Sequence, residues 1–89
     1  GDNPILVEGH TDDVRIVGGH LRTNWELSAA RSFSVIEFLI GRGLTPARFQ
    51  ARGYGEYRPA ASNLTSEGRR QNRRIEISLI REMRKDDGT

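Results

Sequence analysis

The fold is decided by the stretch from Ile5 to Tyr54, in which two short apolar runs flank one long amphipathic segment. The first run, Ile5–Gly9, reads ILVEG and predicts a strand in the interior of a sheet. The second run, Phe49–Tyr54, reads FQARGY and alternates in polarity as strands do. The segment between them predicts a helix from about Trp25 to Arg42. Because two strands joined through one helix form a right-handed parallel crossover, the sequence predicts an α/β domain.

Local signals fix the ends of this helix. Asn24 is the expected N-cap, Glu26 falls in the first turn, and Gly43 is a natural residue to follow the last turn. The residues expected to face the sheet recur at helical spacing. They are Leu27, Ala30, Val35, Phe38 and Leu39.

The rest of the chain predicts one more turn, one short helix and one strand. Thr45-Pro46 is typical of a cap followed by a single helical turn, and Thr65 is expected to cap a helix that ends near Asn72. A last strand is predicted at Arg74–Ile80, with three residues pointing inward: Ile75, Ile77 and Leu79. The expected order, β-α-β-(α)-β, has one strand and one helix fewer than a well-covered sheet needs.

Composition limits the chain to one small domain with a thin core, since only 35% of its 89 residues are hydrophobic and 29% are charged. We expect a flank at residues 1–4, the domain at 5–80 and a polar tail at 81–89. No membrane span is expected, and any targeting segment is expected to lie outside this chain. The absence of cysteine excludes a disulfide framework and a thiolate metal site.

Thr11, Asp12 and Asp13 directly follow the first predicted strand, and ligands of open α/β sheets bind at the carboxyl ends of strands. The alternative is that Thr11 and Asp12 only bond to amides of a turn. Arg31 lies near the buried edge of the helix, where an arginine needs a partner. That partner could be an internal salt bridge to Asp12 or Asp13, or a ligand.

Three other functions have weaker support. The arginine-rich run 69–74 resembles a basic patch, but it lacks interleaved aromatic residues and a helix-turn-helix pattern, so nucleic acid is not the expected partner. His10, Asp12 and Ser28 have the residue types of a hydrolytic triad, but no nucleophile-elbow glycines surround Ser28. His10, Asp12, Asp13 and His20 match no zinc or calcium spacing. We expect no metal, no cofactor and no catalysis.

Taken together, the motifs of this chain strongly resemble those of the OmpA-like peptidoglycan-binding family, in order and spacing, from about residue 5 to residue 80. The matching motifs are Gly9-His10-Thr11-Asp12, Asn24-x-x-Leu27-Ser28-x-x-Arg31, Gly53-Tyr54-Gly55, Pro59 and Gly68-Arg69-x-x-Asn72-Arg73-Arg74-Ile75-Glu76-Ile77. The resemblance implies a sandwich of helices packed on one face of a mixed sheet. It also implies that the first strand and helix of the family domain are missing upstream of Ile5.

The resemblance implies a binding mechanism as well. Family members clasp the free amino-acid end of diaminopimelate, in the peptide stem of peptidoglycan. Carried over, Asp12 would hold the ligand ammonium and Arg31 its carboxylate, through a forked, charge-assisted contact. The other site residues that the resemblance implies are Thr11, Asn24, Leu27 and Arg73.

Within the family, the motifs are most similar to those of the stator proteins that tie the flagellar motor to the cell wall. This implies the periplasmic part of a homodimeric inner-membrane protein. The membrane span and the contacts with an ion-channel partner subunit would lie outside this chain. The alternatives are an outer-membrane lipoprotein or secretion-system component with the same domain and, more remotely, a cell-wall hydrolase.

Overall fold

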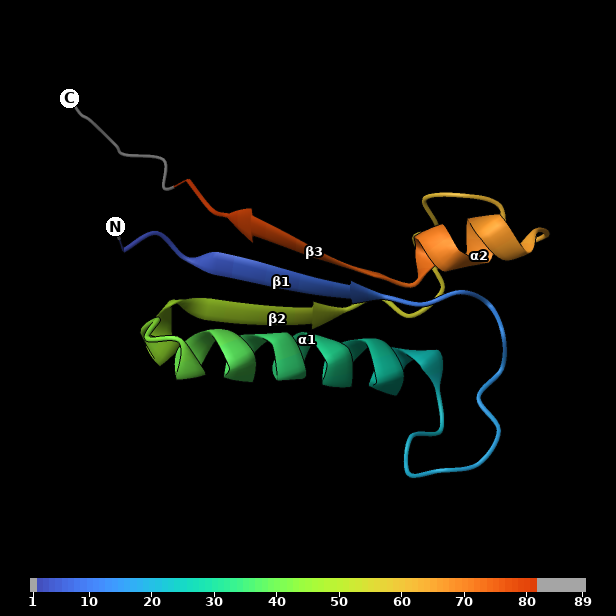
Figure 1. The fold of residues 1–89 in the computed structure, drawn as a ribbon, viewed down its shortest axis with the longest axis horizontal. Helices are drawn as coiled ribbons and strands as arrows, with labels where there is room; N and C mark the ends of the chain where they lie inside the picture. The colour runs from blue at the N-terminus through green and yellow to red at the C-terminus, as the bar shows by residue number, and fades with distance from the viewer. Residues whose placement is uncertain (1, 82–89) are drawn as a thin grey trace.

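The computed structural model describes residues 2–81, which form a three-stranded mixed sheet of order β2-β1-β3 (Figure 1). The central strand β1, Ile5–His10, pairs in parallel with β2, Phe49–Gly53, and antiparallel with β3, Arg74–Leu79. The predicted parallel crossover and the mixed sheet are confirmed. The predicted tail lies outside the described residues except for Arg81.

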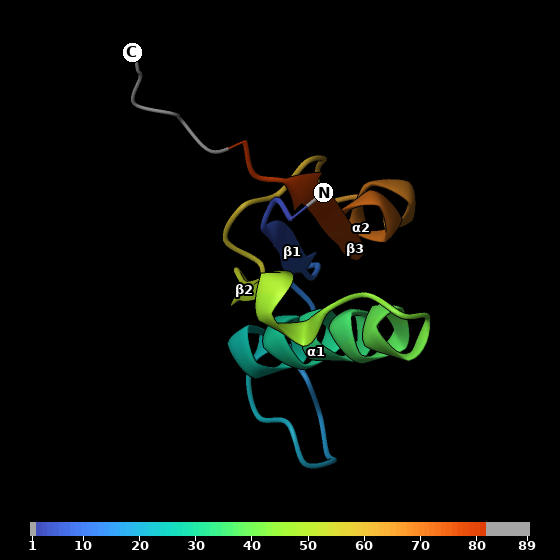
Figure 2. The same cartoon turned by 90° about the vertical axis from the view of Figure 1, so that its left-hand side faces the viewer.

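Two helices accompany the sheet. Helix α1, Asn24–Gly41, lies on one side of β1 and β2, as Figure 2 shows looking along the strands. Helix α2, Ser66–Asn72, lies beyond the ends of β1 and β2 (Figure 1). The predicted single turn is a 3-10 helix at Pro46–Arg48, and Thr65 caps α2 as expected, through a bond from the Gly68 amide. Neither described helix is long and apolar enough to cross a membrane.

The face of α1 that meets the sheet differs from the predicted apolar stripe. Its buried residues are Asn24, Ser28 and Ser32, whereas Phe38 of the predicted stripe is 64% exposed. The small serines face β1 and β2 because the helix packs directly against Gly9 and Gly53. A Cβ atom on Gly9 would collide with the Ser28 carbonyl oxygen, and one on Gly53 would lie 2.6 Å from the Ala29 nitrogen.

The N-cap of α1 is Thr23, and the prediction of Asn24 was wrong. The Thr23 hydroxyl accepts a bond from the Glu26 amide at 3.1 Å, and the Glu26 carboxylate accepts one from the Thr23 amide at 3.2 Å. This reciprocal pair is a capping box. It frees the Asn24 side chain for contacts outside the helix.

The expectation that β3 points its apolar residues into a core was also wrong. Ile77 and Leu79 pair with Val7 and Ile5, so they share the sheet face against which α1 packs. Ile77 is nevertheless 55% exposed and Leu79 66% exposed. Helix α1 lies against β1 and β2, and no other described helix covers β3's share of this face. An uncovered face is what the expected lack of a further strand and helix upstream of Ile5 would leave.

Replacing Gly9 with alanine should destabilise the chain by about 1–3 kcal/mol or more, because the added methyl group overlaps helix backbone that cannot move alone. Gly41 is the matched control: its added Cβ would meet nothing within 4 Å, so Gly41→Ala should be neutral or stabilising, by up to about 1 kcal/mol. Urea unfolding of the two variants measures both effects. Equal stability of the two would contradict the close approach of α1.

Candidate functional site

Asp12 is the second residue after β1 and is only 8% exposed. Its Oδ1 accepts a bond from the Val14 amide at 3.0 Å, which gives the turn contact that the sequence left open. Its Oδ2 accepts a bond from Arg73 Nη1 at 2.7 Å. The carboxylate is thus held in place from two directions, and its negative charge faces the end of α2.

Thr11 keeps this segment in register with the turn after β2. Its amide donates to the Gly55 carbonyl at 2.9 Å, and its hydroxyl donates to the Asp12 carbonyl at 2.7 Å. Gly55 adopts a φ of 61°, in the left-handed region that favours glycine. Thr11 therefore positions the backbone of Asp12, and its own hydroxyl is already bonded.

Asn24 connects three segments at the start of α1. Its Nδ2 group lies 3.3 Å from the Asp12 carbonyl, 3.2 Å from the Val14 carbonyl and 3.0 Å from Glu56 Oε1. Three acceptors share its two hydrogens, so the amide group links the loop after β1, the start of α1 and the turn after β2. The sequence pattern indicates Asn24 as a site residue but not Glu56, for which its charge beside the motif Gly53–Gly55 is the available signal.

Leu27 and Arg31 lie on α1, both partly buried. Among the described residues, Arg31 has no carboxylate within ion-pair distance, and Asp12 pairs with Arg73. The internal salt bridge between Arg31 and Asp12 or Asp13, left open from the sequence, is therefore not formed within the described chain.

Arg73 is fixed by the residue before it. Asn72 is fully buried, and its Oδ1 accepts bonds from the Ala60 and Ala61 amides at 2.8 and 2.9 Å. Its Nδ2 donates to the Ala61 carbonyl and to Asn63 Oδ1, at 2.9 and 2.8 Å. All four bonding positions of the amide are used. This network anchors the end of α2, and hence Arg73, against the loop that precedes the helix.

His10 occupies the opposite face of the sheet from α1. It is 3% exposed, its ring stacks on Tyr54 with centroids 5.2 Å apart, and its Nδ1 has no hydrogen-bond partner among the described residues. Burial lowers the pKa of His10 from its usual 6.5, and the positive charges of Arg74 and Arg58 lower it further, against the opposing effect of Glu76 and Glu8. A neutral ring is thereby favoured next to the Thr11–Asp12 segment.

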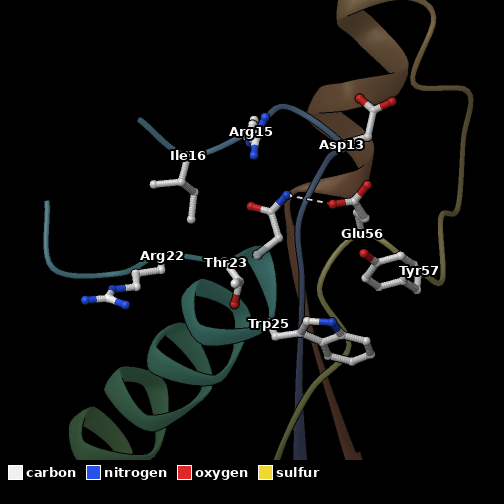
Figure 3. A pocket seen from close by; sticks show the side chains of 9 residues that line it. Asp13, Arg15, Ile16, Arg22, Thr23, Trp25, Glu56 and Tyr57 are labelled. Carbon is white, nitrogen blue, oxygen red and sulfur yellow. Dashed lines mark hydrogen bonds between the residues drawn. The ribbon is translucent and has the colours of Figure 1, made fainter. Parts of the chain in front are cut away.

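A cavity of about 400 Å³ lies between the loop after Asp12, the first turn of α1 and the turn that follows β2. Figure 3 shows Trp25 and Tyr57 side by side at its lower right, and the dashed line marks the bond between Asn24 and Glu56. The two aromatic rings stack with centroids 4.9 Å apart. This cavity could not be predicted from the sequence, because it depends on how the long loop folds back.

The chemical alternatives find no support in this geometry. Ser28 is fully buried, and its hydroxyl donates to the Trp25 carbonyl and accepts from the Gly55 amide, both at 2.9 Å. A hydroxyl used in this way ties α1 to the sheet and is not placed as a nucleophile. Within residues 2–81, no three histidine or acidic side chains lie close enough to hold a metal ion.

Comparison with known proteins defines the class. The OmpA family matches residues 1–73, and the chain therefore belongs to this family. The fold agrees in its mixed sheet and helices. It differs from the family domain in lacking the first strand and helix.

The relatives include motility proteins and a cell wall anchor. Motility protein B of Bacillus subtilis is 43% identical over 77 residues, which are 85% of this chain and 30% of that protein. The C-terminal domain of Helicobacter pylori MotB superposes with a TM-score of 0.84 at 34% identity, covering 90% of this chain and 61% of that one. The cell wall anchor of the T6SS from Pseudomonas aeruginosa superposes with a TM-score of 0.82 at 38% identity, covering 90% and 56%.

The burial of His10 predicts how stability depends on pH. Because the pKa is lower in the folded chain than in the unfolded one, the unfolded chain binds more protons once the pH falls below about 6.5. The contribution of neutral His10 is therefore complete above that pH and declines as the pH falls toward the folded-state pKa. Urea unfolding at pH 7.5 and pH 5.5 should show lower stability at pH 5.5.

The variant His10→Phe keeps a stacking ring but cannot titrate, and it should lose much of this dependence. The exposed His20 provides the control, because His20→Gln should leave the dependence unchanged. Parallel pH profiles for the parent and His10→Phe would contradict the assignment.

Proposed function

We propose that residues 5–80 bind the peptide stem of bacterial peptidoglycan without catalysing a reaction, and so anchor a larger protein to the cell wall. Membership of the OmpA family and similarity to MotB and to a T6SS cell wall anchor support this. The observation that carries it is the Asp12 carboxylate, held at the carboxyl end of β1 beside the first turns of α1.

The proposed ligand group is the free amino-acid end of diaminopimelate. Such a group carries an ammonium and a carboxylate close together, so it needs one acid and one base side by side. Asp12 supplies the acid. A carboxylate offers about four lone-pair positions, so Asp12 can accept a ligand ammonium in addition to its bonds from Val14 and Arg73.

Arg31 supplies the base. It follows Asn24 by two helical turns, which puts both residues on one face of α1, about 10 Å apart along the axis. Side chains on a helix tilt toward its N-terminus, and in this direction an arginine at position 31 can reach toward Asn24 and the Asp12 segment. With no ion pair to a described residue, it is available for the forked contact that a carboxylate accepts.

The remaining site residues have supporting roles. Thr11 and Asn24 hold the backbone of Asp12, and Leu27 lines the α1 side of the site between Asn24 and Arg31. Arg73 balances the charge of Asp12 while no ligand is bound, and its side chain is 42% exposed, which leaves it room to move aside.

For the parent protein we propose a flagellar stator component: a homodimer of the inner membrane that presents this domain in the periplasm and assembles with an ion-channel subunit through other regions. The chain spans 30% of Motility protein B, so these roles are inferred from the domain alone. The second candidate is a secretion-system or lipoprotein anchor, favoured by the similarity to the T6SS anchor.

Sedimentation with purified sacculi tests the proposed clasp. Asp12→Asn keeps the shape of the side chain and removes its charge. Arg31→Ala removes the guanidinium group that would bind the ligand carboxylate. Each variant should weaken binding by about 2–5 kcal/mol, because the opposite charge of the ligand is left unpaired. Circular dichroism confirms that the variants fold.

The matched controls are Glu37→Gln on α1 and Arg42→Ala at its C-cap, which remove exposed charges and should sediment as the parent does. Folded Asp12→Asn and Arg31→Ala proteins that still sediment fully would overturn the clasp. Release of soluble muropeptides by the purified chain would instead favour the hydrolase alternative.

A further inference from the structure

The loop between β1 and α1 carries an apolar tip that no other part of the described chain covers. Val17 is 93% exposed and Val14 is 56% exposed. Gly18 and Gly19 follow, and a Cβ atom on either of them would meet nothing within 4 Å. Both ribbon views show the loop extending away from the sheet and past α1 (Figure 1, Figure 2). Long loops without helix or strand are uncommon in compact domains and usually have a function.

Positive charge lies on both sides of this tip. Arg15 and Arg22 are exposed, and neither forms an ion pair within residues 2–81. Residues 14–22, which we call the basic loop, read VRIVGGHLR and contain no acidic residue. The basic loop therefore combines an exposed aliphatic end with two free guanidinium groups.

The carboxylates nearest in the sequence do not cancel this charge. Glu26 is engaged at the start of α1, where its carboxylate accepts bonds from the backbone amides of Arg22 and Thr23, at 2.6 and 3.2 Å. Asp13 precedes the basic loop and lines the cavity near Glu56 (Figure 3). Both acidic residues lie at the base of the loop, and the tip keeps its positive sign.

An aliphatic tip between two arginines has the chemistry of a contact with an anionic bilayer. Apolar side chains enter the boundary between headgroups and acyl chains, while arginines remain at the level of the lipid phosphates. A groove in a protein partner would need a shaped surface to fit, whereas Val17 is followed by two glycines that offer no side chain. A bilayer requires only apolar area and positive charge, and the basic loop supplies both.

We propose that the basic loop docks on an anionic lipid surface, with Val17 in the boundary region and with Arg15 and Arg22 at the phosphates. This inference goes beyond the proposed function and does not depend on it. One aliphatic side chain and two charges make a weak contact. The contact therefore serves a protein that is already held near a bilayer, where the effective concentration of the surface is high.

Sedimentation with lipid vesicles tests the proposal. One vesicle is made of phosphatidylcholine alone, and the other contains about one quarter phosphatidylglycerol, which is anionic. The parent should bind the anionic vesicles about tenfold to thirtyfold more tightly, as two arginines at such a surface imply, and added salt should reduce the difference. Arg15→Gln/Arg22→Gln should lose the preference, and Val17→Asp should bind neither vesicle.

The control for overall charge is Arg42→Gln/Arg70→Gln, which removes two exposed arginines elsewhere and should keep the preference. Equal binding of the parent to both vesicles would overturn the docking. An equal loss in the control variant would overturn the assignment to the basic loop, because any pair of arginines would then suffice.

A fluorescent label locates the contact. The chain has no cysteine, so Val17→Cys carries one environment-sensitive dye at the tip, and Phe38→Cys carries one at an exposed site near the far end of α1. Anionic vesicles should shift the emission of the tip dye to the blue and leave the second dye unchanged. Equal shifts at both positions would contradict docking through the loop. A shift that appears on raising the protein concentration without vesicles would show a second copy covering the tip, and would also overturn it.

Discussion

The close packing of α1 on the sheet is the constraint from which the rest of the structure follows. Glycine at positions 9 and 53 leaves room for helix backbone where any side chain would collide, and Ser28 and Ser32 fill the interface with hydroxyls that bond across it. Because the helix lies so close, its first turn reaches the end of β1. Asn24 can then bond to the backbone around Asp12, and the candidate site is built on rigid elements.

The second organising feature is a set of buried polar side chains that form hydrogen bonds between segments. Asn24 joins the loop, the helix and the turn after β2, and Asn72 joins the end of α2 to the loop before it. Buried polar networks of this kind specify one arrangement strongly, because each unsatisfied group would be costly. Among residues 2–81 the buried apolar side chains are Ile5, Leu6 and Val7. A domain with so small an apolar core depends on such networks more than a larger domain does.

The elements of this fold could be predicted from the sequence because their signals are local. Strand alternation, the Thr45-Pro46 and Thr65 caps and Gly43 depend on neighbouring residues only. The apolar stripe predicted for the sheet-facing side of α1 was wrong. Apolar spacing within a helix cannot show that Gly9 and Gly53 on the strands bring the helix so close that small serine side chains occupy the interface. The prediction that Ile77 and Leu79 are buried was wrong, because the alternating pattern shows which face of the sheet they share but not whether another element covers that face.

The candidate site was predictable in part for the same reason. The positions of Asp12 near a strand end and of Arg31 on the helix follow from spacing. The other residues implied by the family resemblance lie around the end of β1 and along α1. Glu56, Asn72 and the stacked pair Trp25–Tyr57 were missed, since each acts through contacts between segments far apart in the chain.

The most direct test of the central claim is a crystal structure of this chain with the diaminopimelate-containing tripeptide. We expect the ligand ammonium within hydrogen-bond distance of the Asp12 carboxylate, and the adjacent ligand carboxylate against the Arg31 guanidinium. A peptide bound with this zwitterion away from both side chains would contradict it.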